Sequence, residues 1–252
     1  MIEELIMMND MKLIKISIFF FTFTNLFYLN QLYASQSLTP HNAEYSVNIR
    51  GIKGKLITSL ESSKSTYKSR SMIQASGFAK LLLRGSIREL SVFNETQNSI
   101  YPNTFSSIDA LSRKPRKINL RFDLDENIVK GNIDNETIRL KFDQATYDRE
   151  SLKYALMHYL LNNKKLVNFK LIEDNELKQL LITSIGSKLI KTPYGEFEAI
   201  GIKHAGVNSS KESIFWCVEK LGYLPVRIEQ YRNNKPWMTA VLIKYNNLLI
   251  SP

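Results

Sequence analysis

The feature that most constrains the fold of this chain is an alternation of apolar and polar residues with a period of two. In residues 116–125, RKINLRFDLD, every second side chain from Ile118 onward is apolar, and the same alternation recurs in 137–142, TIRLKF, and in 44–50, EYSVNIR. Successive side chains of a strand point to opposite faces, so such segments bury one face and leave the other in water. The pattern predicts half-buried antiparallel strands and a mainly β protein.

Turn-forming residues separate these strands at intervals of about ten residues, which is the spacing of a meandering sheet, sandwich or barrel. Gly, Asn, Asp or Pro cluster at residues 51–54, 125–127, 134–136, 192–195, 221–225 and 232–236. We therefore predict an all-β fold in the main, with a strongly curved antiparallel sheet that forms a spiral or a half-closed β-roll or barrel.

One segment departs from the period of two. Between 148 and 162 the apolar residues follow helical spacing, with Asp148 in the position of an N-cap and Asn162 at the end. The residues on this stripe are Leu152, Ala155, Leu156, Tyr159 and Leu160. We predict one amphipathic helix at about 148–162, across the concave face of the sheet or at one end of it, and a short helical turn near 77–84.

The N-terminal segment has the order of a secretory signal. Lys12 and Lys15 precede an apolar run that ends near Leu29, and small residues follow at 34–35. We predict a signal peptide at 1–34, with Met11 as an alternative start, and a single exported domain at 38–250. Because Leu32 is larger than the residue usually found at its place, an uncleaved anchor stays open. The expected compartment is the periplasm.

The chain is basic, with a formal net charge of +10. An exported protein rarely meets nucleic acid, so we expect none as a partner and consider a lipid, another anionic envelope component or a second envelope protein instead. No block of five like charges occurs, and a soluble Lys-rich surface explains the charge equally well. We expect a monomer.

No motif of a hydrolase, zinc protein or nucleotide binder is present, so we predict a protein that is not an enzyme and uses no cofactor or metal. The three histidines, His41, His158 and His204, lack ligand spacing, and His158 falls off the apolar stripe, which predicts that it is solvated. Cys217 stands between apolar neighbours on a predicted strand, so we expect a buried, inert thiol.

Two motifs carry a resemblance to a known family. They are KTPYGEFEAIGIKH from Lys191 and FWCVEKLGYLPVRIEQ from Phe215, and both are similar to patterns of the exported bacterial family called domain of unknown function 3108. The matching residues are Thr192, Pro193, Gly195, Phe197, Trp216, Gly222, Tyr223, Pro225, Arg227 and Glu229. The likeness spans about residues 43 to 247, and Tyr194 and Cys217 depart from the pattern.

The resemblance implies a periplasmic, mainly antiparallel β protein, in which related exported families form a spiral or half-closed β-roll around a helix and are tied to envelope integrity. It lends no catalytic residue. The physical reading of the motifs is turn chemistry: Pro193 and Gly195 form a tight turn, and Phe197 returns to the core. Arg227 and Glu229 share a face of one strand, which predicts an ion pair on the wet side.

Two functional hypotheses follow. In the first, the curved sheet holds a lipid-like or other hydrophobic ligand, with Phe78, Leu82, Trp216 and Arg227 as candidate ligand-binding residues. In the second, the core is filled by the protein's own side chains and the chain is an interaction or scaffold protein of the envelope. A cavity smaller than about 300 Å³ favours the second hypothesis.

Overall fold

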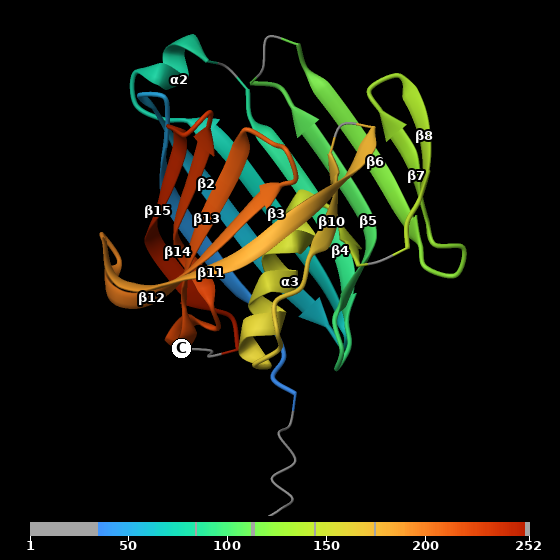
Figure 1. Ribbon diagram of the computed structural model, residues 1–252. Coiled ribbons are helices and arrows are strands. Elements are labelled where there is room, and N and C mark those ends of the chain that lie inside the picture. The colour runs from blue at the N-terminus through green and yellow to red at the C-terminus, as the bar shows by residue number, and fades with distance from the viewer. Residues whose placement is uncertain (1–34, 84, 112–113, 144, 174, 250–252) are drawn as a thin grey trace, which may run out of the picture. The chain divides into compact units, whose positions relative to one another are not determined.

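All fifteen strands of the described chain belong to one sheet, in the order β8-β7-β6-β5-β4-β3-β2-β1-β15-β14-β13-β12-β11-β10-β9 (Figure 1). The computed structural model describes residues 35–83, 85–111, 114–143, 145–173 and 175–249, so the predicted signal segment at 1–34 lies outside the described residues. Every neighbouring pair is antiparallel except β9 and β10, which are parallel. The predicted mainly antiparallel β architecture is confirmed.

The elements are distributed over the whole described chain. The strands are β1 (His41–Ile49), β2 (Ile52–Ser63), β3 (Thr66–Ala75), β4 (Ile87–Glu95), β5 (Ile100–Asp109), β6 (Arg116–Asp123), β7 (Ile128–Ile133), β8 (Glu136–Lys141), β9 (Thr146–Tyr147), β10 (Phe169–Glu173), β11 (Glu176–Thr192), β12 (Gly195–Gly206), β13 (Lys211–Val218), β14 (Leu224–Arg232) and β15 (Lys235–Asn247). The helices are α2 (Ala79–Leu82), α3 (Arg149–Leu161) and the 3-10 helix η1 (Glu219–Leu221).

Most connections are tight hairpins whose residues adopt left-handed backbone. Arg50 and Gly51 between β1 and β2 have φ values of 51° and 90°, and Asn233 and Asn234 between β14 and β15 have 51° and 59°. Paired positive φ values match the right-handed twist of the flanking strands, which explains why Gly and Asn occupy these turns. The exception to the meander is the pairing of β1 with β15, which joins the first and last strands in the middle of the sheet.

The strand order leaves β8 and β9 as free edges, so backbone pairing does not close the sheet, and neither the barrel nor the strongly curved spiral or roll that we predicted is formed. Side chains nevertheless connect the two ends of the order. Ile172 of β10 belongs to the same hydrophobic cluster as Phe122 and Ile138 of β6 and β8, and Leu177 packs against it. The sheet is therefore open but curved, with its concave face toward α3 (Figure 1).

Helix α3 begins and ends where the sequence predicts. Asp148 caps it by accepting hydrogen bonds from the backbone N–H groups of Glu150 and Ser151, both at 2.9 Å, and the Ser151 hydroxyl contacts the Asp148 backbone N–H in return. This is a capping box. The predicted amphipathic character is wrong, because all residues from Glu150 to His158 are buried. Strands of the sheet contact the helix on several sides, so residues outside the apolar stripe are buried as well.

The main core surrounds α3 and contains side chains from both halves of the sheet. Its largest fully buried members include Tyr45 of β1, Phe93 of β4, Tyr154 of α3 and Phe169 of β10. The short helix α2, within the predicted 77–84 turn, instead lies at the end of the sheet beside β2 and β3. No helix among the described residues is long and apolar enough to cross a lipid bilayer.

Candidate functional site

A cavity of about 290 Å³ lies between the N-terminal half of α3 and the strands β10 to β14. We refer to it as the α3 cavity. Four apolar side chains line it from four different elements, namely Leu152, Leu171, Leu180 and Phe215. Its polar lining consists of His204, Ser209, Ser213, Gln230 and Tyr231, with Arg149, Glu173, Lys178, Lys211, Glu212 and Arg232 as charged residues. The α3 cavity therefore has both an apolar part and a polar part.

His204 is the residue that distinguishes the α3 cavity from the other hollows. It extends from the inner face of β12, is 8% exposed, and contacts the ring of Phe215 edge-on at 4.7 Å between centroids. Its Nδ1 atom is buried and has no hydrogen-bond partner within the described part of the chain. Burial lowers the pKa of His204 to about 4, so the ring is neutral at neutral pH. An unsatisfied buried polar atom costs about 1–3 kcal/mol, which a hydrogen-bonding ligand offsets.

Cations outnumber anions around the α3 cavity. Glu173 accepts hydrogen bonds from Lys178 at 2.8 Å and from Lys211 at 3.2 Å. Burial alone raises the pKa of Glu173, but these two lysines lower it overall, so the carboxylate is charged. Arg232 forms no ion pair with any described residue and stacks on Trp237 at 3.6 Å. The lining thus favours a neutral or anionic polar group over a cationic one.

A buried polar cluster at the start of α3 adjoins the α3 cavity. Arg149 pairs with Glu89 of β4, and its guanidinium also donates to the Ser107 hydroxyl at 2.9 Å. Burial raises the pKa of Glu89 to about 7 against the opposing effect of Arg149. Burial likewise raises the pKa of Asp148 to about 6, although hydrogen bonds from Ser151 act against it.

The four candidate ligand-binding residues do not form one site. Phe78 adjoins α2 and is 75% exposed, and Leu82 lies in α2, its side chain being outside the described part of the structure. Trp216 and Arg227 are cross-strand partners on β13 and β14, five and four strands away from β3 in the order of the sheet. None of Phe78, Trp216 and Arg227 lines the α3 cavity.

Trp216 and Arg227 belong instead to a cluster on the outer face of the sheet. Glu229 accepts hydrogen bonds from Arg227 at 2.6 Å and from the Trp216 indole at 3.3 Å, and the Lys188 ammonium lies 3.8 Å from the centre of the Trp216 ring. The predicted Arg227–Glu229 pair is present, but its carboxylate is buried at 8% exposure rather than wet. Gly201 is required beneath the indole, since a Cβ there would lie 2.8 Å from it.

The other motif residues form turns. The Thr192 hydroxyl donates to the Gly195 carbonyl at 2.8 Å and accepts from the Gly195 N–H at 3.1 Å. These two hydrogen bonds stabilise the β11–β12 turn, which contains Pro193. Phe197 then enters the main core. Gly222, with φ of 66°, ends η1. Pro225, after the first residue of β14, offers its carbonyl to the Tyr45 hydroxyl at 3.0 Å.

Two further residues named from the sequence have defined surroundings. Cys217 is 1% exposed, and burial raises the pKa of its thiol far above the ordinary value, as expected for an inert cysteine. His158 contradicts the prediction that it is solvated: it is fully buried, and its Nδ1 lies 2.8 Å from a Glu95 carboxylate oxygen. Among the residues that the structure describes, no group of three or more His, Cys, Asp or Glu side chains could hold a metal ion.

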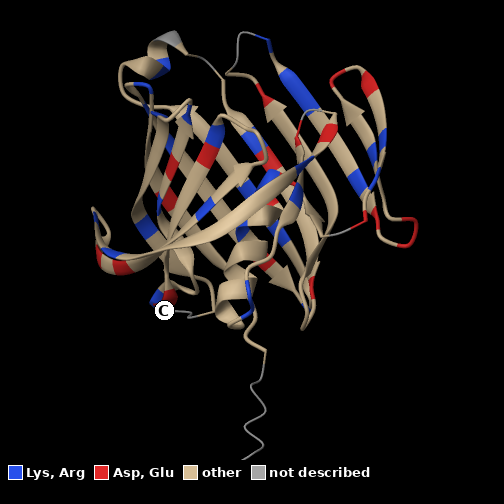
Figure 2. Ribbon diagram, viewed as in Figure 1, with Lys and Arg blue, Asp and Glu red and all other residues tan. Residues whose placement is uncertain are grey.

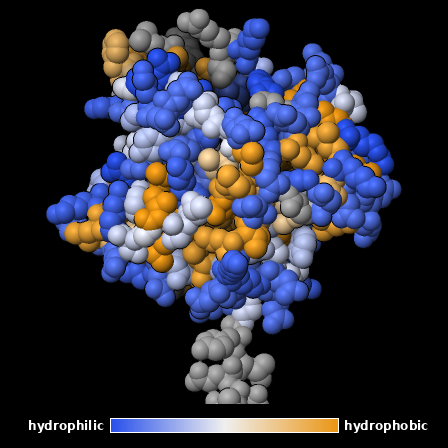
Figure 3. All heavy atoms as spheres, in the orientation of Figure 1, coloured by the Kyte–Doolittle hydropathy of each residue, from blue (hydrophilic) through white to orange (hydrophobic). Residues whose placement is uncertain are grey.

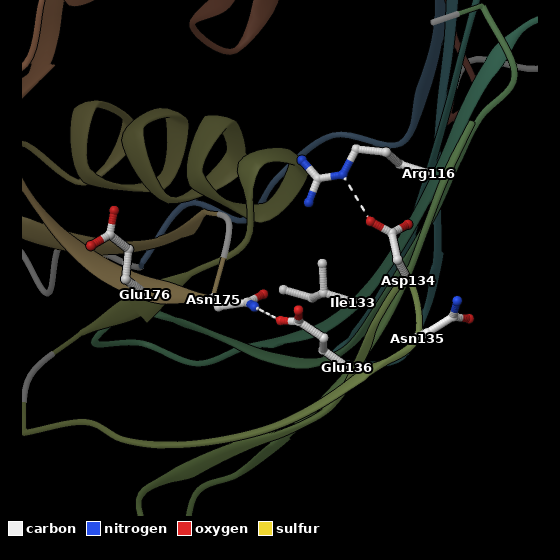
Figure 4. A pocket seen from close by; sticks show the side chains of 7 residues that line it. All are labelled: Arg116, Ile133, Asp134, Asn135, Glu136, Asn175 and Glu176. Carbon is white, nitrogen blue, oxygen red and sulfur yellow. Dashed lines mark hydrogen bonds and ion pairs between the residues drawn. The ribbon is translucent and has the colours of Figure 1, made fainter. Parts of the chain in front are cut away.

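A larger hollow of about 580 Å³ lies between the β7–β8 turn and the β10–β11 turn (Figure 4). Most of its polar groups already have partners within the protein. Arg116 pairs with Asp134 at 3.2 Å, and the Asn175 amide donates to the Glu136 carboxylate. Because its side chains satisfy one another, this hollow links the two ends of the curved sheet and is a weaker candidate site than the α3 cavity.

Comparison with known proteins decides the family. The family model described as "Protein of unknown function (DUF3108)" matches residues 44–234, which is most of the chain. The chain belongs to the DUF3108 family. This confirms the resemblance read from the Thr192–Phe197 and Trp216–Glu229 motifs, which lie inside the matched range. A search of the curated proteins gave no match.

Two solved structures are similar to this DUF3108 protein. One is a β-barrel-like protein of domain of unknown function DUF1849 from Brucella abortus, with a TM-score of 0.54 and 11% identity, covering 83% of this chain and 98% of that one. The other is a Bacteroides fragilis protein with a YmcC-like fold, with a TM-score of 0.37 and 10% identity, covering 84% and 97%. Only the first score supports a shared fold, and it shows nothing about activity.

Proposed function

We propose that this DUF3108 protein is a non-enzymatic, exported binding protein of the cell envelope, whose curved sheet holds a lipid-like molecule in the α3 cavity. The observation that supports this function most directly is the Nδ1 atom of His204, which has no hydrogen-bond partner among the described residues and lies in a cavity with an apolar part. Export rests on the signal-like order of the N-terminal sequence.

The size of the cavity limits the ligand. Ligand pockets usually enclose about 300–1,000 Å³, and the α3 cavity, at about 290 Å³, lies just below that range. It suits one small amphiphile or the end of one acyl chain rather than a whole phospholipid. The apolar part would contact Leu152, Leu171 and Phe215, and the polar end would accept or donate a hydrogen bond at His204.

The test is displacement of a fluorescent fatty-acid probe, together with native mass spectrometry of the full chain purified from its host envelope. Leu171→Trp fills the α3 cavity from a half-buried position on β10, and Leu181→Trp places the same side chain on the outer face of β11, where Leu181 is 48% exposed. We expect only Leu171→Trp to abolish probe binding. Equal probe binding by both variants, or a wild type that binds no probe, would contradict the proposal.

A scaffold function is the second candidate, and two observations favour it. The concave face of the sheet is occupied by α3 and by large side chains such as Tyr45, Phe93 and Tyr154. The α3 cavity, at about 290 Å³, is also slightly smaller than the volume of about 300 Å³ below which we expect a scaffold. In that case no ligand co-purifies, and cross-linking in cells recovers an envelope protein instead. The two functions are therefore separated by the same purified sample.

A further inference from the structure

An exposed apolar projection stands at one end of the sheet, around α2. Phe78 is 75% exposed, Leu81 69% and Leu83 36%, and Ile52 in the neighbouring β2 is 46% exposed. The segments come together through backbone hydrogen bonds, from the Ser76 N–H to the Lys53 carbonyl and from the Arg50 N–H to the Trp237 carbonyl. We call residues 50–54, 76–83 and 232–237 the α2 tip.

The α2 tip is basic throughout. Its three segments contain five Lys or Arg residues and no Asp or Glu, and blue Lys and Arg positions mark the ribbon at and beside α2 (Figure 2). The five cations are Arg50, Lys53, Lys80, Arg232 and Lys235, and none of them forms an ion pair within the described part of the chain. By contrast, lysines elsewhere on the sheet, such as Lys55 and Lys203, have carboxylate partners.

An aromatic ring orders the cations of the α2 tip. The guanidinium of Arg232 lies 3.6 Å from the centre of the Trp237 ring, and that of Arg50 lies 5.2 Å from it. A guanidinium group that stacks on an indole uses its face and not its N–H groups. Both arginines therefore keep N–H donors for a ligand outside the protein. A planar donor of this kind suits phosphate oxygens.

We propose that the α2 tip docks on an anionic lipid surface, with Phe78 and Leu81 inserted at the interface and the five cations against phosphate headgroups. The features that interfacial anchors combine are large apolar side chains, tryptophan and unpaired basic residues, and the α2 tip has all three. Figure 3 shows a further apolar area in the middle of the visible face. Leu181, Ile185 and Leu189 on β11 are also exposed, but none of them belongs to the α2 tip, so they serve for comparison.

The experiment is sedimentation of the full chain with vesicles made of equal parts of phosphatidylglycerol and phosphatidylethanolamine, compared with vesicles of phosphatidylcholine. We expect Phe78→Ser/Leu81→Ser to weaken binding to the anionic vesicles by at least about tenfold. We expect Arg50→Gln/Arg232→Gln to weaken it by about 30-fold at low salt, and by less as salt screens the headgroups.

Matched controls distinguish vesicle binding by the α2 tip from non-specific binding by other exposed residues. Binding by the N-terminal segment is the same in all variants, because they all contain it. Leu181→Ser/Leu189→Ser removes two other exposed apolar side chains, from β11, and Lys141→Gln/Lys165→Gln removes two exposed charges elsewhere. Both controls should bind anionic vesicles as the wild type does.

The proposal is overturned if the tip variants also bind like the wild type. It is equally overturned if they lose only a cross-link to an envelope protein, because the α2 tip is then a protein-binding surface.

Discussion

Replacement of His204 tests the central feature of the α3 cavity, namely a histidine ring that the fold keeps neutral. Burial lowers the pKa of His204 from 6.5 to about 4. The unfolded chain therefore takes up a proton at this residue below pH 6.5, whereas the folded chain does so only near pH 4. The stabilising contribution of the neutral ring is present above pH 6.5 and is lost as the pH falls from 6.5 toward 4.

The magnitude follows from the pKa difference. At about 1.4 kcal/mol per pKa unit, complete loss amounts to about 3 kcal/mol, of which about 2 kcal/mol is lost between pH 7 and pH 4.5. His204→Asn keeps a polar side chain of similar size but cannot titrate. We expect the free energy of unfolding of this variant to fall by about 2 kcal/mol less than that of the wild type over the same interval.

Urea unfolding at pH 7 and pH 4.5, followed by tryptophan fluorescence, measures this difference. The comparison must be made between variants, because Glu89 and Asp148 act in the opposite direction. Burial raises the pKa of these carboxyl groups to about 7 and about 6, so their contribution is present at low pH and is lost as the pH rises through those values. If His204→Asn and the wild type lose the same stability between the two pH values, the reasoning is refuted.

Three other predictions concern structural features of the family motifs and of α3. Gly201→Ala should lower the free energy of unfolding by about 1–3 kcal/mol, since its Cβ would lie 2.6 Å from the Ile185 side chain and 2.8 Å from the Trp216 ring, and only part of the loss should disappear in a Trp216→Ala background when both are measured by urea unfolding. Asp148→Ala should cost about 1–2 kcal/mol in the same assay, because α3 loses its N-cap, whereas Asp148→Asn should cost less. Cys217 should react with a thiol reagent only at the rate of unfolding, and fast labelling of the native protein would show that the thiol is accessible.

The sequence predicted those parts of the fold that depend on local pattern. Alternation in 116–125 places Ile118, Leu120 and Phe122 on one face, and all three are buried in β6. Asp148 is recognisable as an N-cap because Ser151 stands three residues later and completes the box. The pairing of β1 with β15 and the contact between the two ends of the sheet depend on long-range packing, which no local pattern encodes.

The candidate site was harder to predict, because it is marked by polar residues at strand positions that face the interior of the protein. His204 continues the alternation of Ile200 and Ile202, so it could have been assigned to the inner face of β12. Ser69 and Ser91 occupy inward positions of β3 and β4 in the same way, and they donate hydrogen bonds to Glu150 and Asp148 at 2.9 Å. Small polar residues at core positions of strands therefore indicate a polar interior, which allows a helix to bury its charged residues.

Arg232 connects the α3 cavity with the α2 tip. It lines the cavity from the end of β14 and stacks on Trp237, the ring that also holds Arg50. The turn after Arg232 and the turns beside α2 are at the same end of the sheet, because β1, β2, β3 and β15 are neighbours in it. A surface that docks on anionic lipid would therefore bring the cavity close to the headgroups, and a lipid-like ligand would move between membrane and cavity over a short path. Arg232, the residue shared by both features, forms no ion pair with any described residue, so its charge would be available to an anionic headgroup.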